Sequence, residues 1–197
     1  MSQLIRLFIL FSFIAWPSSI ATAAFDASSA VSEFADKAII LMSYSDLSET
    51  ERRDKFEQLV QKYFDLPVIG KFLLGKYWQT ATQAEWDAYL KVFAKNIVYT
   101  YARQLDQYFG QRLVIYGIRK NGRFDIVSSR IVSPKNNEGV RLEWVVAKSN
   151  STFKIIDVII EGMSMSITQR QEYTSVIQAN AGSIKALVDA LSRQITE

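Results

Sequence analysis

This sequence contains neither histidine nor cysteine, so it offers few types of side chain that could carry out catalysis. The two absences exclude Ser-His and Cys-His catalysis and most zinc sites, so any catalysis would rest on carboxylates, Lys or Tyr. The most conspicuous candidate is Asp157, which lies within the apolar run Ile155–Ile160. A carboxylate in an apolar pocket can bind a head group, or it can act as a general base with Tyr101 or Tyr116 as the hydrogen-bond donor to an oxyanion. The alternative is that Asp157 lies at a sheet edge and pairs with a nearby Arg or Lys.

Two further patterns in the sequence indicate no chemistry. The segment Gly70–Lys76 has the spacing of a phosphate-binding loop, but Tyr77 occupies the position of the Ser or Thr that would hold Mg²⁺, and no strand precedes the first glycine. Basic residues form no stripe interleaved with exposed aromatic residues, so we expect no binding to nucleic acid. The sequence therefore predicts neither a metal site nor a cofactor.

The composition is that of a folded protein preceded by an export signal. Of the 197 residues, 49% are hydrophobic and 13% aromatic, which excludes a disordered chain, and the net charge of +3 is too small to indicate a class of partner. Arg6 precedes the apolar run Leu7–Trp16, and the small residues Ala21–Ala23 follow it, which is typical of a cleavable signal peptide over residues 1–23. A run of ten residues is too short to cross a bilayer, which takes about 20. We expect residues 24–197 to form a single exported domain, and the lack of cysteine favours a bacterial periplasm.

Helix-forming segments fill the first half of the expected mature chain. Apolar residues recur at helical spacing over residues 28–46. Two capping boxes follow, Ser48 with Glu51 and Thr82 with Glu85, and each marks the start of a helix.

The remaining helices are predicted from proline, glycine and apolar spacing. Pro67 suits the first turn of a short helix over Val68–Tyr77. The helix that begins after Thr82 should be the longest and should run to about Phe109. Two helices end the chain, the second with apolar residues at helical spacing over Ile184–Ile195.

The middle of the chain alternates with a period of two residues, which is typical of strands. The predicted strands are Leu113–Arg119, Phe124–Ser133, Val140–Lys148 and Phe153–Glu161, and we expect the sheet to end at Gly162. Their short connections leave no room for crossover helices, so the sheet should be an antiparallel meander. The sequence therefore predicts an α+β fold in which helices pack on one face of a curved four-stranded sheet.

Several longer segments resemble those of one known family. They occur in the family's order and with its spacing across nearly the whole expected mature chain: Leu74–Thr82 (LGKYWQTAT), Tyr108–Gln111 (YFGQ), Ile156–Met165 (IDVIIEGMSM), Gln169–Tyr173 (QRQEY), and Gly182 with Leu187 and Leu191. The sequence is thereby similar to the MlaC-type, or toluene-tolerance, phospholipid-binding proteins of the periplasm.

The resemblance implies a cone-shaped α+β body with helices around an apolar lipid cavity. It further implies a monomeric carrier that moves phospholipid between two membrane complexes. These are an outer-membrane lipoprotein–porin complex and an inner-membrane ABC transporter with a substrate-binding ring. The transfer would maintain the lipid asymmetry of the outer membrane. The candidate lipid-binding residues are apolar or aromatic and lie on the expected helices, on the expected sheet and just after it. They are Phe72, Leu73, Phe93, Ile97, Tyr101, Leu142, Trp144, Val146, Ile155, Ile159 and Met163.

Three other interpretations of the sequence remain open. A hopanoid carrier of the same family would share these segments, because side-chain types do not reveal the shape of a pocket. An enzyme on a similar cone-shaped fold would use Asp157 as its base. A module for protein interaction would have a filled core and no ligand.

Overall fold

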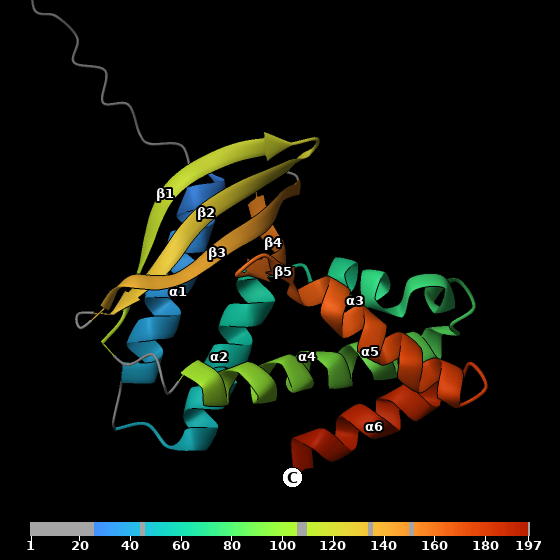
Figure 1. Ribbon diagram of the computed structural model, residues 1–197. Helices are drawn as coiled ribbons and strands as arrows, with labels where there is room; N and C mark the ends of the chain where they lie inside the picture. The colour runs from blue at the N-terminus through green and yellow to red at the C-terminus, as the bar shows by residue number, and fades with distance from the viewer. Residues whose placement is uncertain (1–25, 44–45, 106–109, 134–135, 150–151, 197) are drawn as a thin grey trace, which may run out of the picture.

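A curved antiparallel sheet forms one side of the molecule, and helices pack against it (Figure 1). The computed structural model describes residues 26–43, 46–105, 110–133, 136–149 and 152–196. The expected signal peptide over residues 1–23 lies outside these ranges, so the signal peptide and the single domain that would follow it stay predictions. The predicted α+β class with a curved antiparallel sheet is confirmed.

The two predicted capping boxes both form, and each begins a helix. At α2 (Glu49–Tyr63), the Glu51 amide donates to the Ser48 hydroxyl at 3.2 Å, and the Ser48 amide donates to the Glu51 carboxylate at 2.9 Å. At α4 (Gln83–Leu105), Thr82 and Glu85 make the same two hydrogen bonds at 2.9 and 3.2 Å. These bonds satisfy amide groups that have no partner within the helix, so local sequence alone sets where both helices start.

The third helix differs from its prediction at both ends. Helix α3 (Leu66–Leu74) begins two residues early, because the Asp65 carboxylate accepts a hydrogen bond from the Val68 amide at 3.1 Å. It ends at Gly75, whose φ of 56° is incompatible with a continuing α-helix, and the chain proceeds as the 3₁₀ helix η1 (Gly75–Gln79). A side chain at Gly75 would also meet the Arg170 guanidinium at 2.9 Å.

The sheet has five strands in the order of the sequence, each antiparallel to its neighbours. The four long strands are β1 (Arg112–Asn121), β2 (Phe124–Ser133), β3 (Asn136–Ser149) and β4 (Thr152–Ile160). The expectation that the sheet ends at Gly162 is wrong. Glu161 and Gly162 both have positive φ, and the tight turn that they make returns the chain onto β4 as the short strand β5 (Met163–Ser164).

A β-bulge in β4 decides which side chains face the helices. Its register against β3 passes from Val145 opposite Asp157 to Val146 opposite Ile155, so that Ile156 is an extra residue. Because one inserted residue reverses the alternation of a strand, Ile155 and Ile159 lie on opposite faces of the sheet.

Three more helices complete the fold: α1 (Ala27–Ser43), α5 (Met165–Ala179) and α6 (Ile184–Thr196). Helix α1 crosses the sheet, whereas α5 and α6 lie with α4 at the other end of the molecule (Figure 1). The Asn96 amide of α4 donates to the Gln194 side chain of α6 at 2.9 Å. Besides α6, helix α4 also contacts α2 and α3. None of the helices in the described ranges combines the length and apolarity needed to cross a membrane.

The stability of this fold should depend on pH at its acid end. Four glutamates have a pKa lowered by hydrogen bonds to the charged form: Glu33 from the Tyr63 hydroxyl, Glu51 from the Ser48 hydroxyl, Glu85 from the Thr82 amide and Glu161 from the Arg141 amide. As the pH falls, these glutamates bind protons in the unfolded chain before they do so in the folded protein. Their contribution to the free energy of unfolding is therefore complete above about pH 4.5 and is lost as the pH falls through the folded-state pKa values.

We expect a Tm that is constant from about pH 5.5 to 8 and falls below about pH 4.5, measured by circular dichroism. The chain contains no histidine or cysteine to titrate in the neutral range. A step in Tm near pH 6.5 would contradict this expectation.

Candidate functional site

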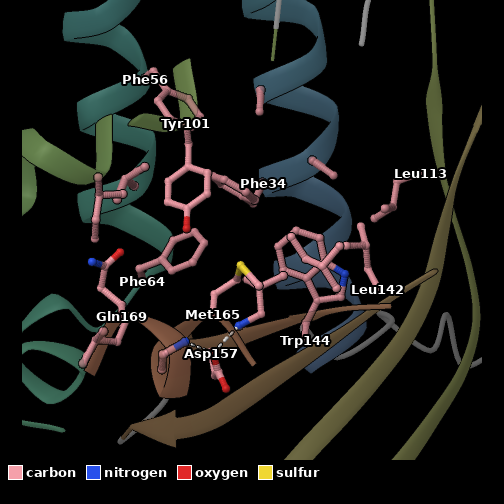
Figure 2. Close-up of a pocket in the computed structure, with 18 of the residues that line it drawn as sticks. Phe34, Phe56, Phe64, Tyr101, Leu113, Leu142, Trp144, Asp157, Met165 and Gln169 are labelled. Carbon is pink, nitrogen blue, oxygen red and sulfur yellow. Dashed lines mark hydrogen bonds between the residues drawn. The ribbon is translucent and has the colours of Figure 1, made fainter. Parts of the chain in front are cut away.

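A cavity of about 240 Å³ lies between the sheet and helices α1 to α5 (Figure 2). Its lining is almost entirely apolar and draws on every long strand. The residues that line it are Phe34, Ala35, Ala38, Ile39, Phe56, Val60, Phe64, Ile69, Leu73, Phe93, Ile97, Tyr101, Leu113, Ile131, Val140, Leu142, Trp144, Asp157, Val158, Ile160, Met165, Ser166 and Gln169.

The helices present their lining residues at a spacing of four. On α4, Phe93, Ile97 and Tyr101 lie one turn apart along a single face, which is the face turned toward the cavity. Helix α1 contributes Phe34 and Ala38 in the same way. The wall is therefore a set of amphipathic helix faces whose apolar stripes meet at a common centre.

The sheet presents its lining residues by alternation. Val140, Leu142 and Trp144 occupy every second position of β3. Beyond the bulge in β4, Val158 lies opposite Trp144 and Ile160 opposite Leu142, so the two strands add rows of side chains to the same face. Trp144 lies on this face with its indole N–H directed to the Ser129 hydroxyl at 2.8 Å, which satisfies the one polar atom of that side chain.

The Asp157 carboxylate is held by three donors where β4, β5 and α5 meet. Its Oδ1 accepts from the Val158 amide at 2.9 Å and from the Ser166 amide at 3.0 Å (Figure 2). Its Oδ2 accepts from the Ser164 hydroxyl at 2.5 Å. Neither of the interpretations made from the sequence includes this arrangement. Asp157 pairs with no Arg or Lys among the described residues, and its hydrogen bonds fix the start of α5 against the sheet.

Charge is almost absent from the cavity. Of the described residues that line it, none is Lys or Arg, and Asp157 is the one acidic residue. Within the described ranges, no group of three or more potential metal ligands comes together. Such a lining suits hydrocarbon, because a buried phosphate would lose its hydration without gaining a cation.

Six of the eleven residues predicted from the sequence come together at this cavity. They are Leu73, Phe93, Ile97, Tyr101, Leu142 and Trp144.

The structure places the other five predicted residues away from the cavity lining. Phe72 points outward and is 41% exposed, because neighbouring residues of a helix point about 100° apart and Leu73 takes the inward position. Ile159 lies on the far face of the sheet, across from Glu143, as a result of the bulge at Ile156.

The remaining three of these residues differ in burial. Val146 and Ile155 face each other across β3 and β4 and are fully buried in the close-packed core rather than at the cavity. Met163 is 63% exposed in β5, and Met165 reaches the cavity in its place (Figure 2).

Much of the wall was not predicted from the sequence. Helices α1 and α2 and the residue that follows α2 contribute Phe34, Ala38, Phe56, Val60 and Phe64, all of which continue apolar stripes at helical spacing in the sequence. That spacing shows that a residue faces inward but not whether it meets a neighbour or a cavity. No comparable signal marks Met165 or Gln169, because both lie just beyond the sheet, and the β4–β5 turn sets their position.

Comparisons with known proteins agree with this architecture. The phospholipid-binding protein of Ralstonia solanacearum, solved in complex with a phospholipid, superposes with a TM-score of 0.76 at 23% sequence identity, covering 87% of this chain and 97% of that one. At this level of identity the match demonstrates a shared fold. The sequence also matches the model of the MlaC protein family over residues 33–193. Because that match spans most of the chain, including the helices and strands that wall the cavity, this protein belongs to the MlaC family.

Proposed function

We propose that this protein is a periplasmic phospholipid carrier that encloses acyl chains in its cavity and leaves the charged head group in water. The observation that carries the proposal is a cavity walled by apolar side chains from five helices and four strands, with no cation among the described residues that line it. Membership of the MlaC family and the phospholipid held by the Ralstonia protein of the same fold support it. A binding role needs no reacting group.

The energetics explain why such a carrier is useful. Each buried methylene contributes roughly 0.8 kcal/mol, so two acyl chains with about 30 methylenes would lose roughly 24 kcal/mol on entering water. A wall of Phe, Ile, Val and Leu side chains resembles the bilayer interior. Transfer from membrane to cavity can then be close to thermoneutral, and the partners determine its direction.

A two-chain lipid requires the cavity to widen. At about 240 Å³ it is smaller than the roughly 300–1,000 Å³ of typical ligand pockets. The start of α3 is tied to β4, since the Asp65 amide donates to the Ile155 carbonyl at 3.0 Å. The wall contributed by α1 meets the cavity through Phe34, Ala35, Ala38 and Ile39, which carry no polar side-chain atom. If α1 moved away from the sheet, these four side chains would lose apolar contacts but no hydrogen bonds.

Membership of the MlaC family supports a wider role. We propose that the carrier receives and delivers lipid at an inner-membrane ABC transporter with a substrate-binding ring and at an outer-membrane lipoprotein–porin complex, and so maintains lipid asymmetry of the outer membrane. Lipid exchange at these partners is a binding equilibrium and involves no covalent step.

Native mass spectrometry of residues 24–197, purified without detergent, tests the carrier proposal directly. We expect added mass equal to one or two phospholipids, and the same lipids in an organic extract of the sample. A bare protein mass that stays unchanged after incubation with phospholipid vesicles would contradict the proposal. An extract that contains a polycyclic lipid instead would assign the protein to hopanoid transport.

A further inference from the structure

One polar group in the cavity wall has no hydrogen-bond partner within the part of the chain that the structure describes. The Tyr101 hydroxyl points from α4 into the cavity (Figure 2), and it forms no hydrogen bond with any other described residue. The other polar side chains of the described lining are all engaged: the Trp144 indole with Ser129, Asp157 with its three donors, Ser166 with Ile156, and Gln169 with Glu172.

An unpaired hydroxyl that faces the cavity becomes unfavourable when hydrocarbon fills the space beside it, because it then loses water without a replacement hydrogen bond. A phenylalanine would fill the same space with no such penalty. The hydroxyl is therefore a candidate contact for something that enters the cavity.

The surroundings of the hydroxyl limit the chemistry of its partner. Burial raises the pKa of Tyr101, and the negative charges of Glu172 and Asp157 raise it further, so the phenol stays protonated and can donate a hydrogen bond. The same two carboxylates disfavour an anionic acceptor such as a phosphate oxygen. Ile97 and Phe93, one and two turns away on α4, surround the site with hydrocarbon. The partner that fits is a neutral carbonyl oxygen attached to an apolar chain.

We propose that the Tyr101 hydroxyl is a polar subsite that donates a hydrogen bond to the ester carbonyl of an acyl chain. This inference rests on the proposed function and adds a chemical preference to it: the cargo is an acyl ester of glycerol. The ester linkage would lie beside α4 and α5, near Gln169, with the acyl chains deeper among the aromatic residues. A polycyclic hydrocarbon or an ether-linked lipid offers no carbonyl at this position.

A competition between two lipids that differ only in this linkage tests the inference. The protein is incubated with vesicles that contain equal amounts of diester and diether phosphatidylethanolamine with chains of the same length, then separated, and its bound lipid is extracted and quantified by mass spectrometry. We expect the wild-type protein to take up the diester lipid about fivefold in excess, which corresponds to one neutral hydrogen bond.

In the Tyr101→Phe variant, the diester excess should fall to about one, because the ring is retained and only the donor is removed. Tyr116→Phe is the matched control, since Tyr116 is 60% exposed on β1 and lies outside the cavity lining, and it should keep the wild-type ratio. Thermal unfolding of all three proteins confirms that each is folded.

The possible outcomes separate the inference from the proposed function. Equal uptake of the two lipids by folded wild-type protein would overturn the inference and leave the carrier proposal standing, and water would then be the partner of the hydroxyl. A diester excess that persists in Tyr101→Phe would also overturn it. Uptake of neither lipid by folded protein would overturn the carrier proposal and the inference together.

Discussion

Ile97→Glu is expected to reduce phospholipid binding by at least 100-fold. The side chain lies on the cavity face of α4 between Phe93 and Tyr101, and none of the described residues that line the cavity is a cation that could pair with a carboxylate there. An unpaired charge against acyl chains costs several kcal/mol, and each 1.4 kcal/mol is a factor of ten in affinity. The measurement is the fraction of protein that carries lipid in native mass spectrometry after incubation with phospholipid vesicles.

Met163→Glu is the matched control for Ile97→Glu. Met163 is 63% exposed and lies outside the lining, so the same change of charge should leave lipid occupancy at the wild-type level. Ala38→Phe gives a second route to the same loss, because it fills the cavity without adding a charge. Folded Ile97→Glu protein that still carries lipid would show that the acyl chains bind elsewhere.

Asp157→Ala is expected to destabilise the fold by about 4 kcal/mol. The substitution removes the common acceptor of the Val158 amide, the Ser166 amide and the Ser164 hydroxyl. Hydrogen bonds to a charged group contribute roughly 1.5–3 kcal/mol each, and their sum is reduced because the three donors share one acceptor. For a chain of this size the corresponding fall in Tm is about 10 °C, which thermal unfolding by circular dichroism would measure.

Two comparisons make the Asp157 result specific. Asp157→Asn should lose about half as much stability, because its amide oxygen can still accept from the two backbone amides. Asp189→Ala removes a carboxylate from an exposed pair with Lys185, so its effect should stay within about 0.5 kcal/mol. An unchanged Tm in Asp157→Ala would contradict the structural role assigned here and would return attention to Asp157 as a general base.

Local sequence was sufficient for the boundaries that local chemistry controls. The capping boxes at Ser48 and Thr82 form as predicted, because each involves residues only three positions apart. The four long strands were predicted from alternation and short connections, both of which are properties of contiguous segments. Family membership, too, could be predicted from the sequence, since it rests on segments spread along the chain.

The residues predicted to bind lipid lie at the cavity where a helix face or a regular strand continues without interruption. Phe93, Ile97 and Tyr101 follow the spacing of α4, and Leu142 and Trp144 follow the alternation of β3. Periodicity fails where the backbone departs from regular geometry.

Two of these departures account for misplaced residues. The bulge at Ile156 turns Ile159 to the far face of the sheet, and the turn at Gly162 creates β5 and leaves Met163 exposed. A bulge is defined by the register between two strands, because the extra residue has no opposite residue in the partner strand. The sequence of β4 alone therefore does not reveal the bulge.

The sequence by itself determined the class of fold, the starts of the two helices that have capping boxes, the four long strands and the family. The tertiary structure decided which apolar stripes meet around a cavity and which pack against each other. Phe34, Val60 and Val146 are all apolar and all buried, yet the first two line the cavity and the third lies in the close-packed core. Periodicity records only that a side chain avoids water, whereas the contents of the space beside it depend on how elements distant in the sequence pack together.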